Sequence, residues 1–193
     1  MLENRGRDQF YKYRSIILFI SSVFRLFPSN IRVKWFIRCR NKGGYLGLVL
    51  RYALLKALAR SCGENVCIQQ NVFLLNPEFL SIGDNVSIHP MVYMECWGNV
   101  EIGNDVSIAQ GATILSVNHN YDRMDIPIKD QGIEKRMVII KSNVWIGAKA
   151  TILGNVTVND GVVIGAGAVV TRNIRANSVV AGVPAREIKL RWT

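Results

Sequence analysis

The strongest constraint on the fold is an aliphatic residue that recurs every six positions through the C-terminal two-thirds of the chain. In one uninterrupted stretch the repeated positions are Ile140, Ile146, Ile152, Val158, Ile164 and Val170. Four residues after each stands a second small or aliphatic residue: Val144, Ala150, Val156, Val162, Ala168 and Ile174. A period of six matches neither the 3.6 of an α-helix nor the 2 of an isolated strand. It indicates a repeat architecture, in which stacked turns bury the aliphatic side chains together.

The same rhythm continues upstream as three triplets that start 20 residues apart. Their aliphatic positions are Cys62, Ile68 and Leu74, then Ile82, Ile88 and Met94, then Ile102, Ile108 and Ile114. Between them lie segments such as 83–85, 103–105 and 159–161, made of Gly, Asn and Asp, which tolerate left-handed corners. We therefore predict a mainly β fold, a parallel β-helix of about five to six coils with three short strands in each. A chance alternation in an ordinary β protein is the alternative, and six consecutive in-phase repeats argue against it.

The first 61 residues lack this pattern and carry the positive charge of the chain. They contain thirteen Lys and Arg residues against Glu3 and Asp8, whereas residues 62–193 are close to neutral. We predict helices over 11–27, 31–40 and 46–60, with Arg51, Lys56 and Arg60 on one polar side of the last. This part is then either a solvated helical cap or an amphipathic element that binds anionic lipid, and we favour the second. Nucleic-acid binding is not expected, because no known nucleic-acid-binding module accompanies the charge.

The sequence also predicts where the chain resides. Its longest apolar stretch without charge, residues 15–24, is half of the roughly 20 residues that a membrane-spanning helix needs, and no cleavage site for a signal peptide follows. Four cysteines form no CxxC pair or regular framework, which is typical of free thiols in a reducing compartment. We expect a cytoplasmic protein, peripheral on the cytosolic face of the membrane.

Four motifs in the repeat region resemble those of the hexapeptide-repeat acyltransferases. They are Asn143–Ala148 (NVWIGA), Val162–Gly167 (VVIGAG), Val170–Ile174 (VTRNI) and Val180–Arg186 (VAGVPAR). The resemblance covers residues 62–190 and is strongest to the sugar and polysaccharide O-acetyltransferase branch. It implies a left-handed β-helix, acetyl-CoA as co-substrate, and a homotrimer with active sites between subunits. We divide the chain into a helical segment (1–61), an acyltransferase domain (62–180) with an inserted loop at 118–137, and a C-terminal tail (181–193).

The inserted loop contains the catalytic candidate. His119 opens this polar insert, which interrupts the repeat between Ile114 and Ile140, and long loops on rigid scaffolds are usually functional. The resemblance implies that His119 is the general base, taking a proton from the acceptor hydroxyl as it attacks the thioester. It also implies an oxyanion-binding backbone N–H near Ala148. No Ser or Cys stands in a nucleophile motif, so we expect direct transfer.

The same resemblance nominates binding residues for both substrates. The cofactor candidates are Ala148, Ala166, Thr171, Arg172, Arg186 and Lys189, the alanines for the pantetheine arm and the cations for phosphates. Trp145 either lines the cofactor groove or covers the coil surface. On the acceptor side, His89 and Trp97 stand where sugar acetyltransferases have asparagine and aspartate, which argues against a simple galactoside or maltose as substrate. Tyr93 and Glu95 either extend an aromatic wall with Trp97 or only cover a bulge.

We therefore predict an acetyl-CoA-dependent O-acetyltransferase for a sugar hydroxyl of a surface glycan or its lipid-linked precursor. The alternatives are a soluble acetyltransferase for a free sugar, a nucleotide-sugar amine or a xenobiotic, and a catalytically silent scaffold. No metal is expected, because the γ-type carbonic anhydrases on this scaffold need three histidine ligands and the chain has two.

Overall fold

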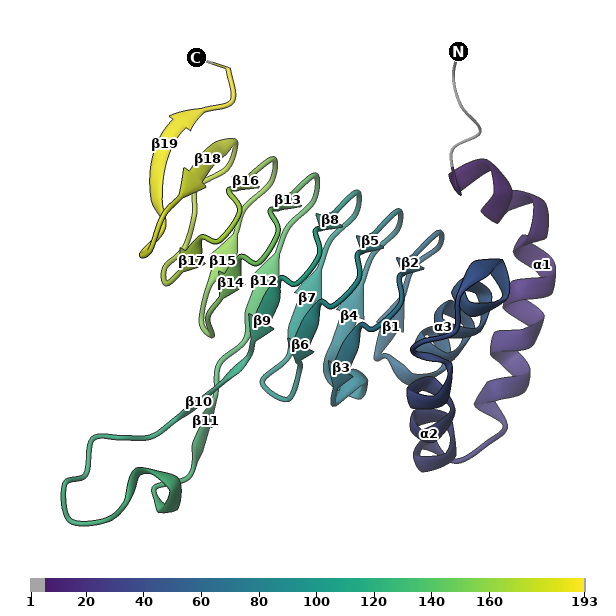
Figure 1. Cartoon of the computed structure of the whole chain (residues 1–193), viewed down its shortest axis with the longest axis horizontal. Coiled ribbons are helices and arrows are strands. Elements are labelled where there is room, and N and C mark those ends of the chain that lie inside the picture. The colour runs from purple at the N-terminus through teal and green to yellow at the C-terminus, as the bar shows by residue number, and fades with distance from the viewer. Residues whose placement is uncertain (1–5, 193) are drawn as a thin grey trace.

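The computed structural model describes residues 6–192 and shows a solenoid of about six turns with three helices at its N-terminal end (Figure 1). Each turn contributes one short strand to each of three parallel sheets, which we call the first, second and third faces. The predicted fold class, a left-handed parallel β-helix behind an N-terminal α-helical segment, is confirmed.

The strands follow one another from face to face along the chain. The first face contains β1 (Ser61–Cys62), β4 (Leu80–Ile82), β7 (Val100–Ile102), β12 (Val138–Ile140) and β15 (Thr157–Val158). The second face contains β2 (Cys67–Ile68), β5 (Ser87–Ile88), β8 (Ser107–Ile108), β13 (Trp145–Ile146), β16 (Val163–Ile164) and β18 (Ser178–Ala181). The third face contains β3 (Phe73–Leu75), β6 (Tyr93–Glu95), β9 (Thr113–Leu115), β14 (Thr151–Ile152) and β17 (Val169–Val170). The last strand, β19 (Arg186–Leu190), turns back antiparallel to β18 and so ends the parallel stack.

The repeated aliphatic residues form the core. From Ile140 to Val170 every predicted inward position is buried, as are the second residues of each pair. Cys62 and Leu74 of the first turn are only half-buried, whereas Ile68 of the same turn is fully buried. Asn85 and Asp105 adopt positive φ angles of 57°, as the corner prediction requires. Burial on three sides and left-handed corners therefore account for the six-residue period.

The extra residues of the upstream triplets all lie at one corner, between the third and first faces. In the first turn this corner contains the 3₁₀ helix η1 (Pro77–Phe79), and in the second turn a loop around Trp97. In the third turn it opens into an arm made of β10 (Val117–His119), η2 (Ile128–Asp130) and β11 (Ile133–Lys135), which projects from the solenoid (Figure 1). The arm corresponds to the insert predicted at 118–137, and β10 and β11 pair antiparallel as its stem.

The N-terminal helices close the open end of the first turn. They are α1 (Gly6–Arg25), α2 (Ser29–Cys39) and α3 (Gly44–Leu58). α3 packs against β1, β2 and η1, and α1 and α2 both pack against α3. Leu54, Leu55 and Leu58 of α3 are buried in the same core as the strands. The helices therefore form one layer that continues the core of the solenoid. No helix among residues 6–192 is long and apolar enough to cross a membrane.

One expectation about α3 is wrong. Arg51, placed by the sequence on a polar side, is 1% exposed. Its guanidinium donates hydrogen bonds to the carbonyl oxygens of Ile68 (2.8 Å), Cys39 (3.1 Å) and Lys42 (2.6 Å). Burial lowers its pKa, but the group stays protonated and satisfies carbonyls at the end of α2, in the α2–α3 link and in β2. Helical periodicity could not show this, because the acceptors come from three different parts of the chain.

Candidate active site

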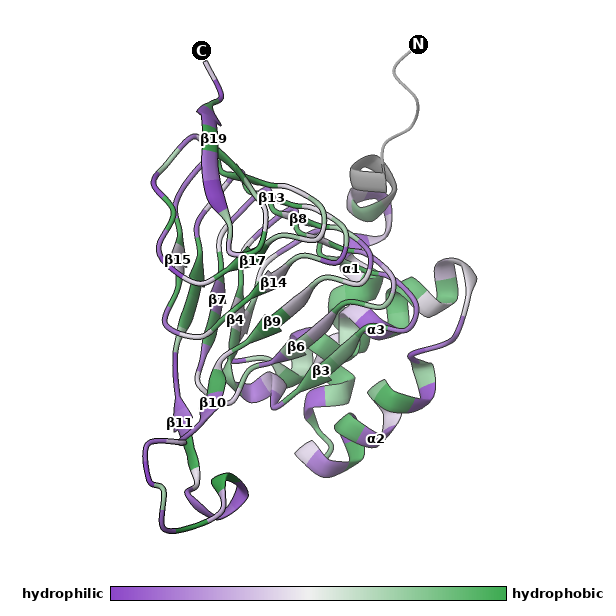
Figure 2. Cartoon of the chain, turned by 60° about the vertical axis from the view of Figure 1, so that its left-hand side comes forward, coloured by the Kyte–Doolittle hydropathy of each residue, from purple (hydrophilic) through white to green (hydrophobic). Residues whose placement is uncertain are grey.

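The residues nominated from the sequence surround the third face of the solenoid. Figure 2 shows its strands β3, β6, β9, β14 and β17 side by side, with the arm at one edge. At the corner where the second face meets the third lie His89 of the second turn, Ala148 of the fourth and Ala166 of the fifth. At the opposite corner lie Trp97, the arm and the segment after β17 that contains Thr171 and Arg172. Residues as far apart in sequence as His89 and Arg172 are thus brought to one surface.

Ala148 and Ala166 share a backbone feature that suits ligand binding. Gly147 and Lys149 donate their backbone N–H groups to the carbonyls of Ile164 and Gln110, and Gly165 and Gly167 donate to Val180 and Ala148. Within the described chain, the N–H groups of Ala148 and Ala166 have no such partner. The two alanines lie one coil apart at the same corner, Ala166 exposed and Ala148 half-buried, and we call their two unpartnered N–H groups the open amides. Such a column of donors can bind the carbonyls of an extended ligand or an oxyanion.

The arm presents His119 to solvent. His119 is the last residue of β10 and pairs with Ile133 of β11, and it is exposed. The arm leaves the third turn at the corner opposite to Ala148, and it points away from the solenoid (Figure 1). One chain by itself therefore does not bring His119 and the two alanines together.

The base of the arm is fixed by contacts that the sequence did not predict. The ammonium group of Lys135 lies over the ring of Trp97 (4.5 Å to the centroid) and over that of Phe79 (5.4 Å). The backbone N–H of Gly98 donates to Ser116 Oγ (2.9 Å), and a Cβ at Gly98 would come within 1.8 Å of the Ser116 carbonyl oxygen. Trp97 thus has a positioning role for the arm. Lys135 was missed because nothing in the local sequence pairs it with residues 38 and 56 positions earlier.

The acceptor candidates flank a single strand. His89 precedes β6 and Trp97 follows it, so they lie at opposite corners of the second turn with Tyr93 and Glu95 on the strand between them. The Tyr93 ring lies 6.4 Å from that of Phe73 in the turn below, and Glu95 accepts a hydrogen bond from the Trp97 backbone N–H (2.9 Å). These residues cover the coil and also form its partly aromatic outer surface.

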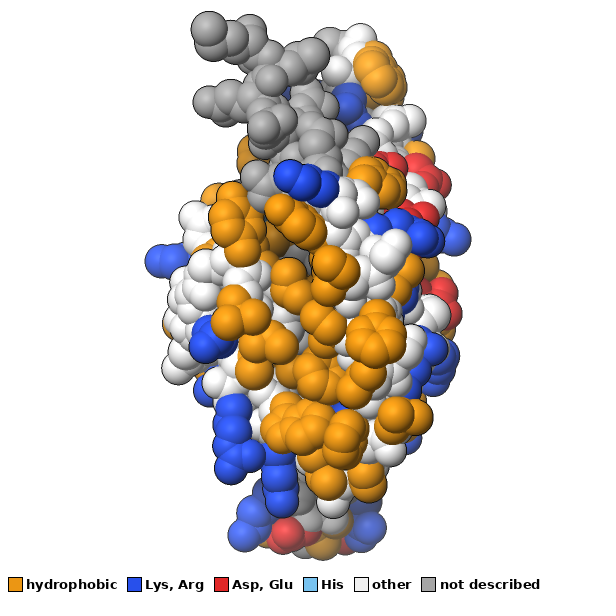
Figure 3. All heavy atoms as spheres, turned by 90° about the vertical axis from the view of Figure 1, so that its right-hand side faces the viewer, with side chains coloured by type: hydrophobic (Ala, Val, Ile, Leu, Met, Phe, Trp, Pro, Cys, Tyr) orange, Lys and Arg blue, Asp and Glu red, His pale blue; other side chains and the backbone are white. Residues whose placement is uncertain are grey.

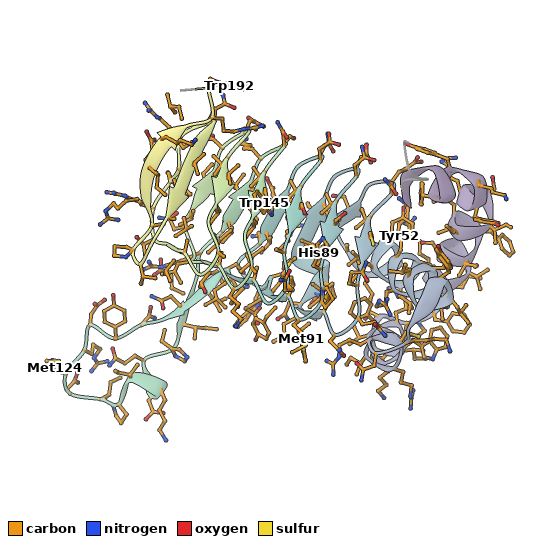
Figure 4. All side chains as sticks on the ribbon, turned by 45° about the horizontal axis from the view of Figure 1, so that its top comes forward. Tyr52, His89, Met91, Met124, Trp145 and Trp192 are labelled. Atoms are coloured by element: carbon orange, nitrogen blue, oxygen red, sulfur yellow. The ribbon has the colours of Figure 1, made fainter. Side chains whose placement is uncertain are left out.

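The cofactor cations are spread over the last two turns. Thr171 and Arg172 are exposed after β17, Arg186 begins β19 beside Ala181, and Lys189 lies farther along β19 opposite Val179. The segment before Arg186 packs over the start of β17, where the Ala185 N–H donates to the Val169 carbonyl (2.8 Å). Arg186 is therefore near the corner that contains Ala148 and Ala166, which we call the alanine corner. Lys189, in contrast, belongs to the second face. Trp145, which is 55% exposed, lies on the second face near His89 (Figure 4).

The cysteines do not resemble nucleophiles. Burial raises the pKa of Cys62 and of Cys96 to about 12, and it also raises the pKa of Cys67. These thiols therefore stay protonated near neutral pH, and a thiol is a poor nucleophile compared with a thiolate. Among the residues that the structure describes, no three His, Cys, Asp or Glu side chains are grouped so that they could hold a metal ion.

Comparisons with known proteins agree with this geometry. The family model "Bacterial transferase hexapeptide (six repeats)" matches residues 137–172. The chain is 32% identical over 140 residues to the galactoside O-acetyltransferase of Escherichia coli, covering 72% of this chain and 68% of that protein. It is 35% identical over 113 residues to the putative lipopolysaccharide biosynthesis O-acetyl transferase WbbJ of the same organism, covering 55% of this chain and 58% of that protein. A galactoside acetyltransferase solved in complex with coenzyme A superposes with a TM-score of 0.69 at 26% identity, covering 84% of this chain and 80% of that one.

The chain belongs to the hexapeptide-repeat acetyltransferase family. Within that family its relatives include sugar O-acetyltransferases, in agreement with the branch indicated by the motifs. The chain spans only 37% of the length of another relative, a probable acetyltransferase of Mycobacterium tuberculosis, and 58% of WbbJ.

Proposed function

We propose that this chain transfers an acetyl group from acetyl-CoA to a sugar hydroxyl of a surface glycan or of its lipid-linked precursor. The observation that carries the proposal is the stacked pair of unpartnered backbone N–H groups at Ala148 and Ala166, at one edge of the third face, with the arm that bears His119 at its other edge. The relatives named as sugar O-acetyltransferases and the related structure with bound coenzyme A support the choice of both substrates.

The chemistry is a direct transfer. His119 takes the proton of the acceptor hydroxyl while that oxygen attacks the thioester carbonyl carbon, and the amide of Ala148 stabilises the negative charge that develops on the carbonyl oxygen. The C–S bond then breaks, and the leaving sulfur recovers a proton from His119. Arg172, Arg186 and Lys189 supply positive charge for the phosphates of coenzyme A, and His89 with Trp97 contacts the acceptor.

The test is transfer by the purified full-length chain. We expect thiol release from acetyl-CoA only with a glycan acceptor, and one added acetyl unit per acceptor repeat by mass spectrometry. Turnover with a free sugar, a nucleotide-sugar amine or a drug in place of the glycan would favour the soluble alternative. If acetyl-CoA does not bind at all, the catalytically silent scaffold is the better interpretation.

The first specific prediction concerns the alanine corner as the site of cofactor binding. Replacing Ala166 by Phe covers the open amides, so we expect the Kd for acetyl-CoA to rise by about tenfold or more in isothermal titration. Ala176 is the matched control, because it is an exposed alanine directly before a positive-φ residue, Asn177, at a corner away from the third face. Ala176→Phe should bind acetyl-CoA as the unchanged protein does. Equal affinities for all three proteins would contradict this cofactor site.

The second prediction concerns the oligomeric state of the chain. Because one chain keeps His119 apart from the alanine corner, we propose a homotrimer in which the arm of one subunit reaches the third face of its neighbour. Sedimentation equilibrium should give three times the 21.7 kDa chain mass. Mixing His119→Ala and Ala166→Phe chains should restore part of the activity, since some mixed interfaces then contain both intact residues. A fully active monomer would overturn the shared site.

A further inference from the structure

α1 has two apolar faces, and only one of them is used within the chain. Ile17 and Phe24 face inward, Ile17 as part of the buried core and Phe24 with its ring 5.6 Å from that of Trp35. The opposite face contains Ile16, Phe19 and Val23, whose exposed fractions are 61%, 68% and 36%, and the stripe continues into Leu26 (83%), directly after the last residue of the helix. An ordinary surface helix is polar on the side away from the core, so this second stripe requires a partner.

The stripe is part of a larger surface. Figure 3 views this end of the molecule and shows apolar side chains gathered over the helices, with Lys and Arg side chains around them. We define the apolar end surface as the outer stripe of α1 together with Phe27, which is 39% exposed in the link to α2. Exposed aromatic and aliphatic side chains elsewhere on the helices, including Tyr13 and Ile37, extend the apolar area.

From position 10 to position 60 all charged residues of the helical layer are cationic. Between positions 10 and 60 the sequence contains eleven Lys and Arg residues and no Asp or Glu. Several of these cations act inside the fold: Arg14 pairs with Glu64, Lys56 donates to the Cys62 carbonyl (2.6 Å), and Arg51 is buried as described above. Others have exposed side chains, namely Lys12, Lys34, Arg38 and Lys42. The surface around the apolar stripe is therefore cationic even after the internal contacts are set aside.

We infer that the apolar end surface docks on an anionic lipid bilayer, with α1 lying in the plane of the interface. An apolar stripe flanked by cations is complementary to acyl chains beneath anionic headgroups. A second copy of the chain is a poorer occupant, since pairing two such surfaces would bring like charges together, and residues 10–60 contain no carboxylate to offset them. The inference deepens the proposed function, because it names the partner that would present a lipid-linked acceptor.

This assignment also corrects which residues enter the interface. The amphipathic interpretation of the sequence did not separate inward from outward apolar residues, and the structure buries Ile17 of α1 and Leu54, Leu55 and Leu58 of α3 in the core. The lipid-facing set is smaller and lies on one side of α1. The inner face of α1 packs against α3, and its outer face is the docking surface that we infer.

The experiment is vesicle flotation of the full-length protein. Vesicles of phosphatidylcholine with phosphatidylglycerol should carry the protein upward at low salt, with binding weakened by added salt or by omitting the anionic lipid. The double variant Phe19→Asp/Leu26→Asp should lower the vesicle partition coefficient at least about tenfold, since it replaces two inserted side chains by anions. Trp192→Asp is the matched control: it introduces a carboxylate at an exposed Trp at the far end of the chain (Figure 4) and should float normally.

Each outcome of the flotation experiment either supports or overturns the docking surface. Failure of the unchanged protein to bind anionic vesicles, or normal flotation of the double variant, would overturn the docking surface. The docking surface would also be overturned if the double variant lost self-association without any change in lipid binding, because the stripe would then be a contact between copies of the chain. Acetyl-CoA turnover in solution reports the proposed function separately, so that either idea can fail while the other stands.

Discussion

Replacing His119 by Ala should lower kcat by roughly 10²–10⁴-fold, the usual contribution of a general base. Affinity for acetyl-CoA should stay within about twofold of the unchanged protein, because the proposed role of His119 is to take the proton of the acceptor hydroxyl and not to hold the cofactor. Steady-state kinetics and isothermal titration give the two values. Since the side chain is exposed and ends β10, its truncation removes no core packing.

The matched control for His119 is on the same arm. Lys129 of η2 is exposed, so Lys129→Ala should fold identically and retain normal turnover. If His119→Ala retains turnover within a few-fold of the unchanged protein, the proton is taken by another group. If both variants lose activity equally, the arm acts through its position and His119 has no separate chemical role.

Replacing Arg51 by Ala should lower the free energy of unfolding by about 3 kcal/mol or more. The change leaves the buried carbonyls of Ile68, Cys39 and Lys42 without their donor, and it opens a cavity between α3 and the first turn. Urea unfolding followed by circular dichroism measures the difference. The effect should appear mainly as early loss of helical signal, because Arg51 connects the helices to β2.

A surface arginine of the same layer is the control for Arg51. Arg38→Ala, at an exposed position of α2, should change the free energy of unfolding by no more than about 0.5 kcal/mol. Equal effects of the two substitutions would mean that the buried hydrogen bonds add little beyond general charge. A small effect of Arg51→Ala alone would show that the first turn can repack around the cavity.

The repeat region was predictable because its cause is local. One inward aliphatic residue per short strand, such as Ile146 or Ile152, repeats whatever the rest of the chain does, and both are fully buried. Corner residues such as Asn85 could be predicted for the same reason, since the left-handed conformation depends on the residue itself. The approximate helix ranges also followed from Pro28 and the Gly43–Gly44 break.

The features that escaped prediction depend on contacts between distant segments. The buried state of Arg51, the position of Lys135 between two aromatic rings and the two-sided use of α1 each involve partners from other turns or helices. The candidate site could be predicted from the sequence only in part, for a related reason. Motifs nominated Ala148 and Ala166, but their open amides emerge only when the hydrogen bonds between stacked coils are known.

The stacking of the turns also sets the distance between the helices and the arm. Neighbouring coils are one strand spacing apart, about 4.8 Å, and β10 leaves the third turn, two spacings beyond the first turn, against which α3 packs. A bilayer against the outer face of α1 would lie below the base of the arm by these two spacings and the thickness of the helices, because α1 packs on α3. The solenoid would then act as a ruler that selects a sugar by its distance from the lipid. Adding one turn between cap and arm would move acetylation outward along the glycan without changing a single residue of the site.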